Sequence, residues 1–163
     1  MPKKFAVCSS LAVLAFCVAA FAADPKPAAT APSYSEGFLN WRLLRADTLD
    51  PKNPATAQRT DVHFVYGNDK AIEGLRTGQF PEGAAFVLDI FNVAKKDGVV
   101  TLGDRASTSN MVRDARAAAT GGWVFGDFDL ATKAALPMDV IPACFNCHTQ
   151  MADHAYVFTR LKF

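Results

Sequence analysis

The sequence predicts an α+β fold with a substantial antiparallel β-sheet and a few short helices. Two observations predict the sheet. Residues 62–66 alternate with the two-residue period of a strand, so that every second side chain falls on the same face. Residues 84–93 are rich in β-branched and aromatic side chains, and the hairpin signal Lys96-Asp97-Gly98 leads from them into a second such run at 99–102. These signals argue against a helical bundle.

We expect the domain to begin with a short amphipathic helix over residues 34–46. Ser33 and Glu36 have the spacing of a capping box. Three large apolar residues then recur at three-residue spacing: Phe38, Trp41 and Leu44. Residues 50–57 contain two prolines and are expected to form a loop.

The elements after the first strand follow from the turn and breaker residues of the chain. Gly67 ends that strand, and residues 69–77 are expected to form a short helix that Gly78 stops. Residues 79–83, with one proline and one glycine, are expected to form a turn before the next strand.

The last third of the chain is predicted to contain one more strand and one more helix. Residues 123–128 follow a pair of glycines and have a strand pattern. In that strand, one face would carry the side chains of Trp123, Phe125 and Asp127. Residues 110–118 are ambiguous, because their alanines favour helix on propensity alone. Pro142 suits the first turn of a helix over the residues that follow.

The N-terminus follows the pattern of an export signal. Lys3 and Lys4 precede an apolar run from Leu11 to Phe21, and Ala20 and Ala22 provide the small residues that a signal peptidase reads. The run is about half of the ~20 residues that span a bilayer. We therefore expect cleavage after Ala22 and a periplasmic mature protein without a membrane span, with an uncleaved N-terminal anchor as the alternative.

Removal of residues 1–22 changes two counts. The mature chain keeps 15 basic and 16 acidic residues, so it has no positive surplus to attract nucleic acid or an anionic membrane surface. Cys8 and Cys17 leave with the signal, and the two remaining cysteines lie in one motif. Residues 23–33 are rich in proline and alanine and are expected to form a flexible leader. Residues 34–163 have the length of one domain.

The remaining cysteines belong to Cys144-Phe145-Asn146-Cys147-His148, the attachment pattern for a c-type haem. On one helical turn, two thiols three residues apart can each bond to one vinyl group on the same porphyrin edge. The adjacent imidazole then lies under the iron as the proximal ligand. The sequence therefore predicts one covalent haem c held by Cys144, Cys147 and His148.

Three other interpretations of the motif are weaker. A zinc site needs further ligands, and the mature chain offers only His63 and His154 outside the motif. A redox dithiol of the thioredoxin kind normally opens a helix after an early strand, whereas this pair lies near the C-terminus. A structural disulfide across two intervening residues would be strained.

We expect the iron to lack a sixth ligand from the protein. Met151 follows His148 too closely to reach the opposite face of the haem. The other candidate sixth ligands are better explained by packing, pairing or exposure. They are Met111, Met138, His63 and His154. A five-coordinate iron would be open to a small molecule, and the polarity of the distal pocket would decide which one.

Several segments together resemble the cytochrome P-460 family, which includes the cytochromes c′-beta. They are V-H-F-V-Y-G-N at 62–68, T-G-Q-F-P-E-G at 77–83, G-G-W-V-F at 121–125, the haem motif, and Y-V-F-T at 156–159. The resemblance extends over about residues 34–159. It implies a curved antiparallel sheet with a few helices, a haem against the sheet and a homodimer. It also implies that residues 110–115 are strand.

Which function the resemblance implies depends on one lysine. Hydroxylamine-oxidising members of the family carry a lysine, cross-linked to the porphyrin, on the strand after the F-P-x-G turn, and that position falls on Leu88 here. The lysines nearest to Leu88 in the sequence are expected to fall outside that strand. They are Lys70, Lys95 and Lys96. Those enzymes also use a distal carboxylate, and the only acidic residue between positions 130 and 141 is Asp139.

Strand periodicity places Phe86, Leu88 and Ile90 on one face, so the surface offered to the haem would be apolar. Such a surface donates no hydrogen bond to dioxygen or peroxide, whereas nitric oxide and carbon monoxide need none. In the cytochromes c′-beta, aromatic residues cap the iron, and Phe80 and Phe86 are the candidates here, with core packing as the alternative for each. Solvated surface is the default for Arg113, Asp114 and Arg116.

Three functions follow from these observations. The first is an exported haem protein that binds nitric oxide or carbon monoxide for scavenging, storage or sensing. The second is an oxidoreductase of the P-460 type that converts hydroxylamine or nitric oxide. The third is a periplasmic electron carrier, which would need a sixth ligand such as Met111. The sequence does not name a redox partner, and a four-helix cytochrome c′ is the alternative fold.

Overall fold

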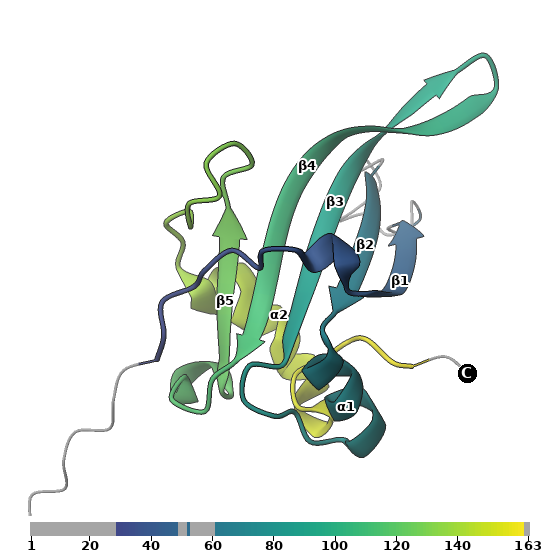
Figure 1. Cartoon of the computed structure of the whole chain (residues 1–163). Helices are drawn as coiled ribbons and strands as arrows, with labels where there is room; N and C mark the ends of the chain where they lie inside the picture. The colour runs from purple at the N-terminus through teal and green to yellow at the C-terminus, as the bar shows by residue number, and fades with distance from the viewer. Residues whose placement is uncertain (1–28, 49–51, 53–60, 162–163) are drawn as a thin grey trace, which may run out of the picture.

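A five-stranded antiparallel sheet forms the frame of the molecule, and its strands are neighbours in the order in which they occur along the chain (Figure 1). The strands are β1 (Arg42–Thr48), β2 (Asp61–Gly67), β3 (Ala85–Lys96), β4 (Val99–Arg113) and β5 (Trp123–Phe128). The computed structural model describes residues 29–48, 52 and 61–161. The predicted α+β class with its antiparallel sheet is confirmed, while the predicted signal and the loop at 50–57, apart from residue 52, lie outside the described residues.

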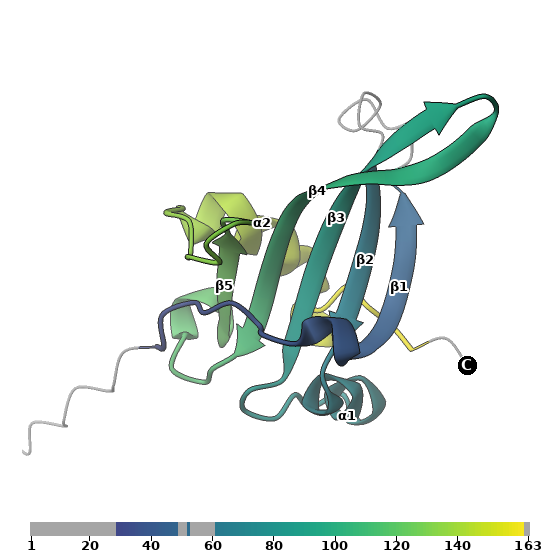
Figure 2. The same cartoon turned by 45° about the horizontal axis from the view of Figure 1, so that its top comes forward.

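Each face of the curved sheet is covered by a different end of the chain. Residues 141–154 form a C-terminal helical segment made of η3 (Ile141–Phe145), α2 (Asn146–His148) and η4 (Thr149–His154). Figures 1 and 2 show this segment behind the sheet and the N-terminal segment in front of it. No helix within the described ranges is long and apolar enough to cross a membrane.

The strand β2 forms where the two-residue period predicts it. Along β2, buried and half-buried side chains alternate without interruption, so each face of the strand packs against a different layer. A long hairpin joins β3 to β4, and it turns at Asp97 and Gly98, which both have positive φ (52° and 77°). Two consecutive left-handed residues are the requirement of a type I′ turn, and the D-G pair meets it.

The short helix α1 (Asp69–Thr77) also begins and ends where the sequence predicts. The side chain of Asn68 caps its first turn by accepting a hydrogen bond from the backbone N–H of Ala71 (2.9 Å). Gly78 ends the helix in the left-handed region with φ 77°. Gly74 inside the helix leaves room for the ring of Phe80, which a Cβ at position 74 would approach to 2.1 Å.

The predicted helix over residues 34–46 is wrong. Residues 38–40 form a single 3₁₀ turn, η1 (Phe38–Asn40), and β1 follows it as an edge strand paired with β2. Phe38 packs on Tyr66 on one face of the sheet, whereas Leu44 packs against the core on the other. A helix would hold these two apolar side chains on one side, so their regular spacing was misleading. Glu36 does not close a capping box but forms an ion pair with Lys133 (2.9 Å).

The resemblance predicts residues 110–115 better than helix propensity does. β4 continues through Asn110 to Arg113, between β3 and β5, and ends just before Asp114. Pairing on both sides satisfies the backbone of these residues, and this outweighs the helix preference of the alanines that follow. Those alanines lie in a turn and in η2 (Ala118–Thr120).

A buried polar group lies on the front face of the sheet, away from the C-terminal helical segment. Asp89 has no exposed surface, accepts a hydrogen bond from Thr108 (2.9 Å) and forms an ion pair with Arg105 (2.9 Å). Burial raises the pKa of the Asp89 carboxyl, and the two partners lower it only in part. The guanidinium of Arg105 lies over the rings of Phe38 and Phe91.

Residues 29–40, here called the N-terminal strap, cross this front face and are held there by hydrogen bonds. Asn110 Nδ2 donates to the backbone carbonyl of Ser33 and to the hydroxyl of Ser35, both at 2.8 Å. The backbone N–H of Thr30 donates to Asp114 (2.8 Å). The described part of the predicted flexible leader, residues 29–33, therefore lies against the sheet.

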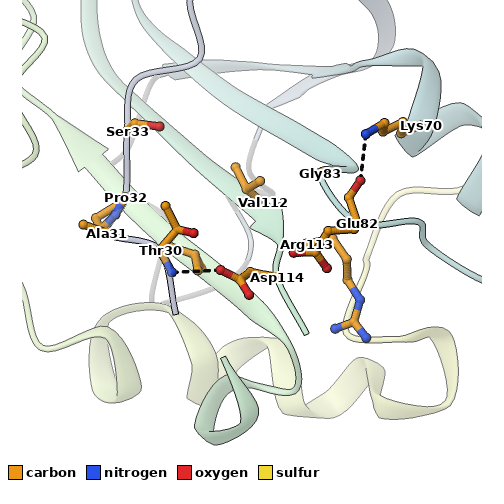
Figure 3. A pocket seen from close by; sticks show the side chains of 11 residues that line it. Thr30, Ala31, Pro32, Ser33, Lys70, Glu82, Gly83, Val112, Arg113 and Asp114 are labelled. Carbon is orange, nitrogen blue, oxygen red and sulfur yellow. Dashed lines mark hydrogen bonds between the residues drawn. The ribbon is translucent and has the colours of Figure 1, made fainter. Parts of the chain in front are cut away.

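A cleft of about 260 Å³ lies where the strap meets the turn between α1 and β3 (Figure 3). The charged side chains that line it have partners in the protein. Lys70 donates to the backbone carbonyl of Glu82 (2.9 Å), and the Glu82 carboxylate accepts from the backbone N–H of Ala115 (3.1 Å). Asp114 is paired with Arg116 (2.8 Å). These groups join the strap, α1 and the end of β4 to one another.

The attachment of the strap should depend on pH through Asp114. Hydrogen bonds from Arg116, and next from the backbone N–H of Thr30, hold the pKa of its carboxyl well below the usual range. A lowered pKa in the folded state stabilises the protein above about pH 4, and this contribution is lost as the pH falls toward the folded-state value. Asp114→Asn should therefore flatten the acid limb of stability, measured by urea unfolding between pH 5 and pH 2.

The matched control for this prediction is Asp153→Asn. Asp153 is exposed, and no hydrogen bond of its side chain is found in the described part of the chain. That variant should follow the unmodified protein over the whole range. An acid limb that is unchanged in Asp114→Asn would show that this carboxylate does not carry the effect.

Candidate haem-attachment site

The haem motif lies on the first turns of the C-terminal helical segment. Pro142 occupies the start of η3, as predicted, where its missing N–H removes no helical hydrogen bond. The backbone N–H of Ile141 donates to the side chain of Asp139 (3.3 Å), which caps the same end. The backbone then continues in helical geometry through Cys147 and His148, so the motif is presented on consecutive helical turns.

Both thiols of the motif are free, but their surroundings differ. Cys144 is half-buried against the core of the sheet, with its Sγ 3.8 Å from Sδ of Met138. Burial raises the pKa of the Cys144 thiol, and the nearby charges of Asp127 and Cys147 raise it further. Cys147 is exposed, and its Sγ lies 3.5 Å from the amide nitrogen of Gln150. Neither thiol is committed to a disulfide, so both can form thioether bonds.

The imidazole of His148 is fixed at one nitrogen. Its Nδ1 lies 2.6 Å from the backbone carbonyl oxygen of Tyr156, an acceptor, so Nδ1 carries the proton. Burial lowers the pKa of His148, and the hydrogen bond to Tyr156 offsets this only in part. The ring packs edge-on against Phe125 (5.0 Å between centroids) and Phe158 (5.1 Å). No partner for Nε2 is found among the described side chains or backbone groups.

This arrangement fits a proximal ligand to haem iron. A neutral imidazole whose Nδ1–H is bonded to a carbonyl presents the lone pair of Nε2 in a defined direction. Cys144 and Cys147 precede it at the spacing that thioether attachment needs. The residues of the motif therefore fit a c-type haem, which would supply an iron centre for ligand binding or electron transfer.

The face of the sheet that the helical segment covers is mostly apolar. Directly paired residues share a face, and the register places Phe125, Met111 and Phe86 in one row across β5, β4 and β3. In the next row Leu88 pairs with Val65 on β2. With the first residues of the helical segment, these side chains form part of the main core cluster.

Polar side chains interrupt this face: Ser109 and Asp127 in the row of Leu88, and His63 and Ser107 in the row of Ile90. Sequence reasoning missed Ser109. Ser109 on β4 is the partner of Leu88, and it donates a hydrogen bond to Asp127 on β5 (3.0 Å). The strand pattern had placed Asp127 on the side of Trp123, but nothing in the pattern of β4 marked Ser109. The face is therefore apolar at its centre and polar beside Cys144.

The three residues predicted for the distal pocket do not have equal surroundings. The rings of Phe80 and Phe86 pack on each other (5.8 Å between centroids) and on Trp123. Leu88 is partly exposed on the same sheet face. Phe80 and Phe86 thus belong to a packed aromatic cluster, and their role as a cap over the iron stays a prediction, as does that of Leu88.

The other candidate ligands lie in separate places. Met111 is buried in the core, and Met138 lies beside Cys144. His63 is buried on β2 and pairs with Asp61, with 3.1 Å between Nε2 and Oδ1. Among the described residues, no group of three or more histidine, cysteine, aspartate or glutamate side chains could hold a metal ion. The arrangement gives no support to a zinc site.

The nearest lysines are also remote from the position of Leu88 along the fold. Lys70 lies on α1 and is bonded to Glu82. Lys95 and Lys96 lie on β3 itself, contrary to the prediction, because hairpin pairing with Val100 and Val99 extends the strand to its tip. Arg113 donates to the carbonyls of Gly121 and Gly122 and lies over the ring of Trp123. Arg113 therefore supports the loop before β5. The sequence-based expectation that it is a solvated surface residue did not anticipate this role.

Comparison with known proteins identifies one family. The family model described as Cytochrome P460 matches residues 35–159, which is most of the chain, and this confirms the resemblance drawn from the sequence. No significant match is found among curated proteins.

Attachment through the motif makes a direct prediction for secreted protein produced together with haem-attachment machinery. The unmodified protein should gain the mass of one haem and keep its colour through acid–acetone extraction, because thioether bonds survive this treatment. Replacement of both Cys144 and Cys147 by alanine should release the pigment. Asn146→Ala, an exposed residue between the two cysteines, should keep it. Colourless unmodified protein would contradict the assignment.

Proposed function

The chain belongs to the cytochrome P460 family, which implies a c-type haem, and from this premise we propose a specific role. The protein is an exported cytochrome with one haem, a five-coordinate iron and a mainly apolar distal surface. It binds nitric oxide or a similar diatomic ligand such as carbon monoxide, for scavenging, storage or sensing. The haem iron, held by His148, supplies the binding chemistry, and the surrounding side chains decide which ligand is retained.

The observation that carries this proposal is the residue at position 88. In the resemblance to the family, the position of the cross-linking lysine of the hydroxylamine-oxidising members falls on Leu88 of β3, which is flanked across the sheet by Val65. A leucine side chain has no nitrogen to form a bond with the porphyrin. Phe86 and Met111 beside it offer no hydrogen-bond donor, and the hydroxyl of its register partner Ser109 already donates to Asp127. This disfavours dioxygen and peroxide relative to nitric oxide.

The environment of the candidate sixth ligands supports an open iron. Met111 packs within the core cluster, and Met138 lies next to a thiol on the attachment side. His63 already pairs with a carboxylate. Each of these side chains would have to leave its present partners to bind the iron, so an electron carrier with two protein ligands is the least supported of the three functions.

Hydroxylamine or nitric oxide oxidation remains the second candidate, and one observation favours it. Asp127 is a carboxylate on the haem-side face, close enough to Cys144 to raise the pKa of its thiol. A carboxylate in that place could accept a proton from a substrate. The lysine cross-link of the enzymatic members would have to come from Lys70, which is bonded to the carbonyl of Glu82.

The proposal extends to the setting of the protein. The signal predicted over residues 1–22 places the mature chain in the periplasm, where covalent attachment retains the haem. The family resemblance suggests a homodimer. The electron-transfer partner is unidentified, and nucleic acid is not expected as a partner because the mature chain has no excess of positive charge.

Absorption and resonance Raman spectra of the reduced protein, with and without nitric oxide, test the coordination. We expect a high-spin five-coordinate ferrous iron that is converted to a nitrosyl adduct. The intact mass should equal the chain plus one haem, without the further hydrogen loss of a lysine cross-link. A six-coordinate low-spin iron at rest would contradict the proposal, and hydroxylamine turnover with an artificial electron acceptor would favour the enzyme.

The apolar surface makes a separate prediction. Leu88→Gln introduces a hydrogen-bond donor on the haem-side face, so the ferrous protein should bind dioxygen more tightly while its affinity for nitric oxide changes little. Leu43→Gln is the matched control, since Leu43 is exposed on the edge strand β1. Ligand titrations of the two variants measure the effect. Equal dioxygen affinities in both would show that residue 88 does not face the bound ligand.

A further inference from the structure

The acceptor for His148 lies in an unusual turn. Ala155 and Tyr156, directly after the C-terminal helical segment, both have left-handed backbone conformations, with φ of 52° and 66°. Residues with a Cβ atom adopt this region seldom and at a cost in energy. The turn nevertheless aims the carbonyl of Tyr156 back at Nδ1 of His148, at the short distance of 2.6 Å.

The turn is held from two sides. Within the segment, the backbone N–H of Tyr156 donates to the carbonyl of Met151 (2.8 Å). From the sheet, the indole N–H of Trp123 donates to the carbonyl of Ala155 (2.9 Å). The indole is thus bonded to the residue immediately before the one that accepts from His148. Apart from His148 itself, no other side chain in the described part of the chain is seen to donate to this turn.

Trp123 is itself held in place. It is 1% exposed, and its ring packs against Phe80 (5.3 Å between centroids) and lies beneath the guanidinium of Arg113 (5.8 Å). The preceding Gly121 has φ 64°, and a Cβ at that position would approach the ring of Tyr156 to 2.2 Å. The loop before β5 therefore fits closely against the left-handed turn.

We propose that Trp123 is a positioning residue for the proximal ligand: through the carbonyl of Ala155 it holds the Ala155–Tyr156 turn, and the turn directs the Tyr156 carbonyl to His148. This rests on the proposed coordination of the haem iron by His148. A full hydrogen bond from Nδ1 increases the electron density of the imidazole, which strengthens the bond from Nε2 to iron and favours the ferric state. The β-sheet would thus act on the iron through a residue that contacts the turn and not the imidazole of His148.

The test compares Trp123→Phe with the unmodified holoprotein. Phenylalanine keeps an aromatic ring in the cluster but removes the N–H donor. The iron–histidine stretching band of the ferrous protein should move to lower frequency, and the reduction potential should rise. Trp41→Phe is the matched control, because Trp41 precedes the edge strand β1 at the opposite side of the sheet from Trp123. It should leave both quantities unchanged.

A second pair of variants changes the turn without touching Trp123. Ala155→Val places a β-branched residue at positive φ, which should displace the turn and cause the same shifts as Trp123→Phe. Ala155→Gly tolerates the left-handed conformation and should keep the band and the potential of the unmodified protein. This pair also gives a result if Trp123→Phe fails to fold.

The outcomes separate this inference from the proposed function. An iron–histidine band that is absent from the unmodified ferrous protein would mean that the iron is not five-coordinate with His148 as its ligand, and the proposed coordination would fail first. If the band is present but unchanged in both Trp123→Phe and Ala155→Val, the positioning role is wrong. A shift in Trp123→Phe alone would also overturn it, because the effect would then come from ring packing.

Discussion

The packing of the C-terminal helical segment against Phe125 is the contact on which the site depends. Phe125 on β5 lies against the imidazole of His148 and the ring of Phe145, two residues of the haem motif. The same strand provides Trp123 for the turn after the segment and Asp127 beside Cys144. A single edge strand therefore contacts the imidazole and holds the turn that carries the acceptor of its hydrogen bond, because alternate residues of a strand point to one face.

The two faces of the sheet serve different purposes because different termini cover them. The face toward the helical segment is mainly hydrophobic, which suits a large flat cofactor. The face beneath the N-terminal strap contains a fully buried carboxylate, Asp89, and an asparagine, Asn110, that ties down the strap. Buried polar groups need specific partners, so this second face restricts where the strap can lie.

Local sequence patterns predicted the structure correctly where the strand pairing of the fold agreed with them. The alternation in β2, the D-G turn of the hairpin and the extent and stop of α1 all depend on neighbouring residues, and each was found as predicted. The segment over residues 34–46 failed because its apolar spacing fitted a helix while its backbone gained partners from β2, far along the sequence. Helix propensity gave the wrong expectation for residues 110–113 for the same reason, since two neighbouring strands satisfy their backbone.

By itself the sequence predicts the attachment chemistry, because Cys144, Cys147 and His148 stand together in one short motif whose spacing is local. It also determined the family and the absence of a lysine at position 88. Only the tertiary structure decided what surrounds that motif. The acceptor of the His148 hydrogen bond is a backbone carbonyl, and the indole that holds its turn comes from a strand some thirty residues earlier. A carbonyl has no signature in sequence, and its direction depends on φ angles that only the packed chain sets.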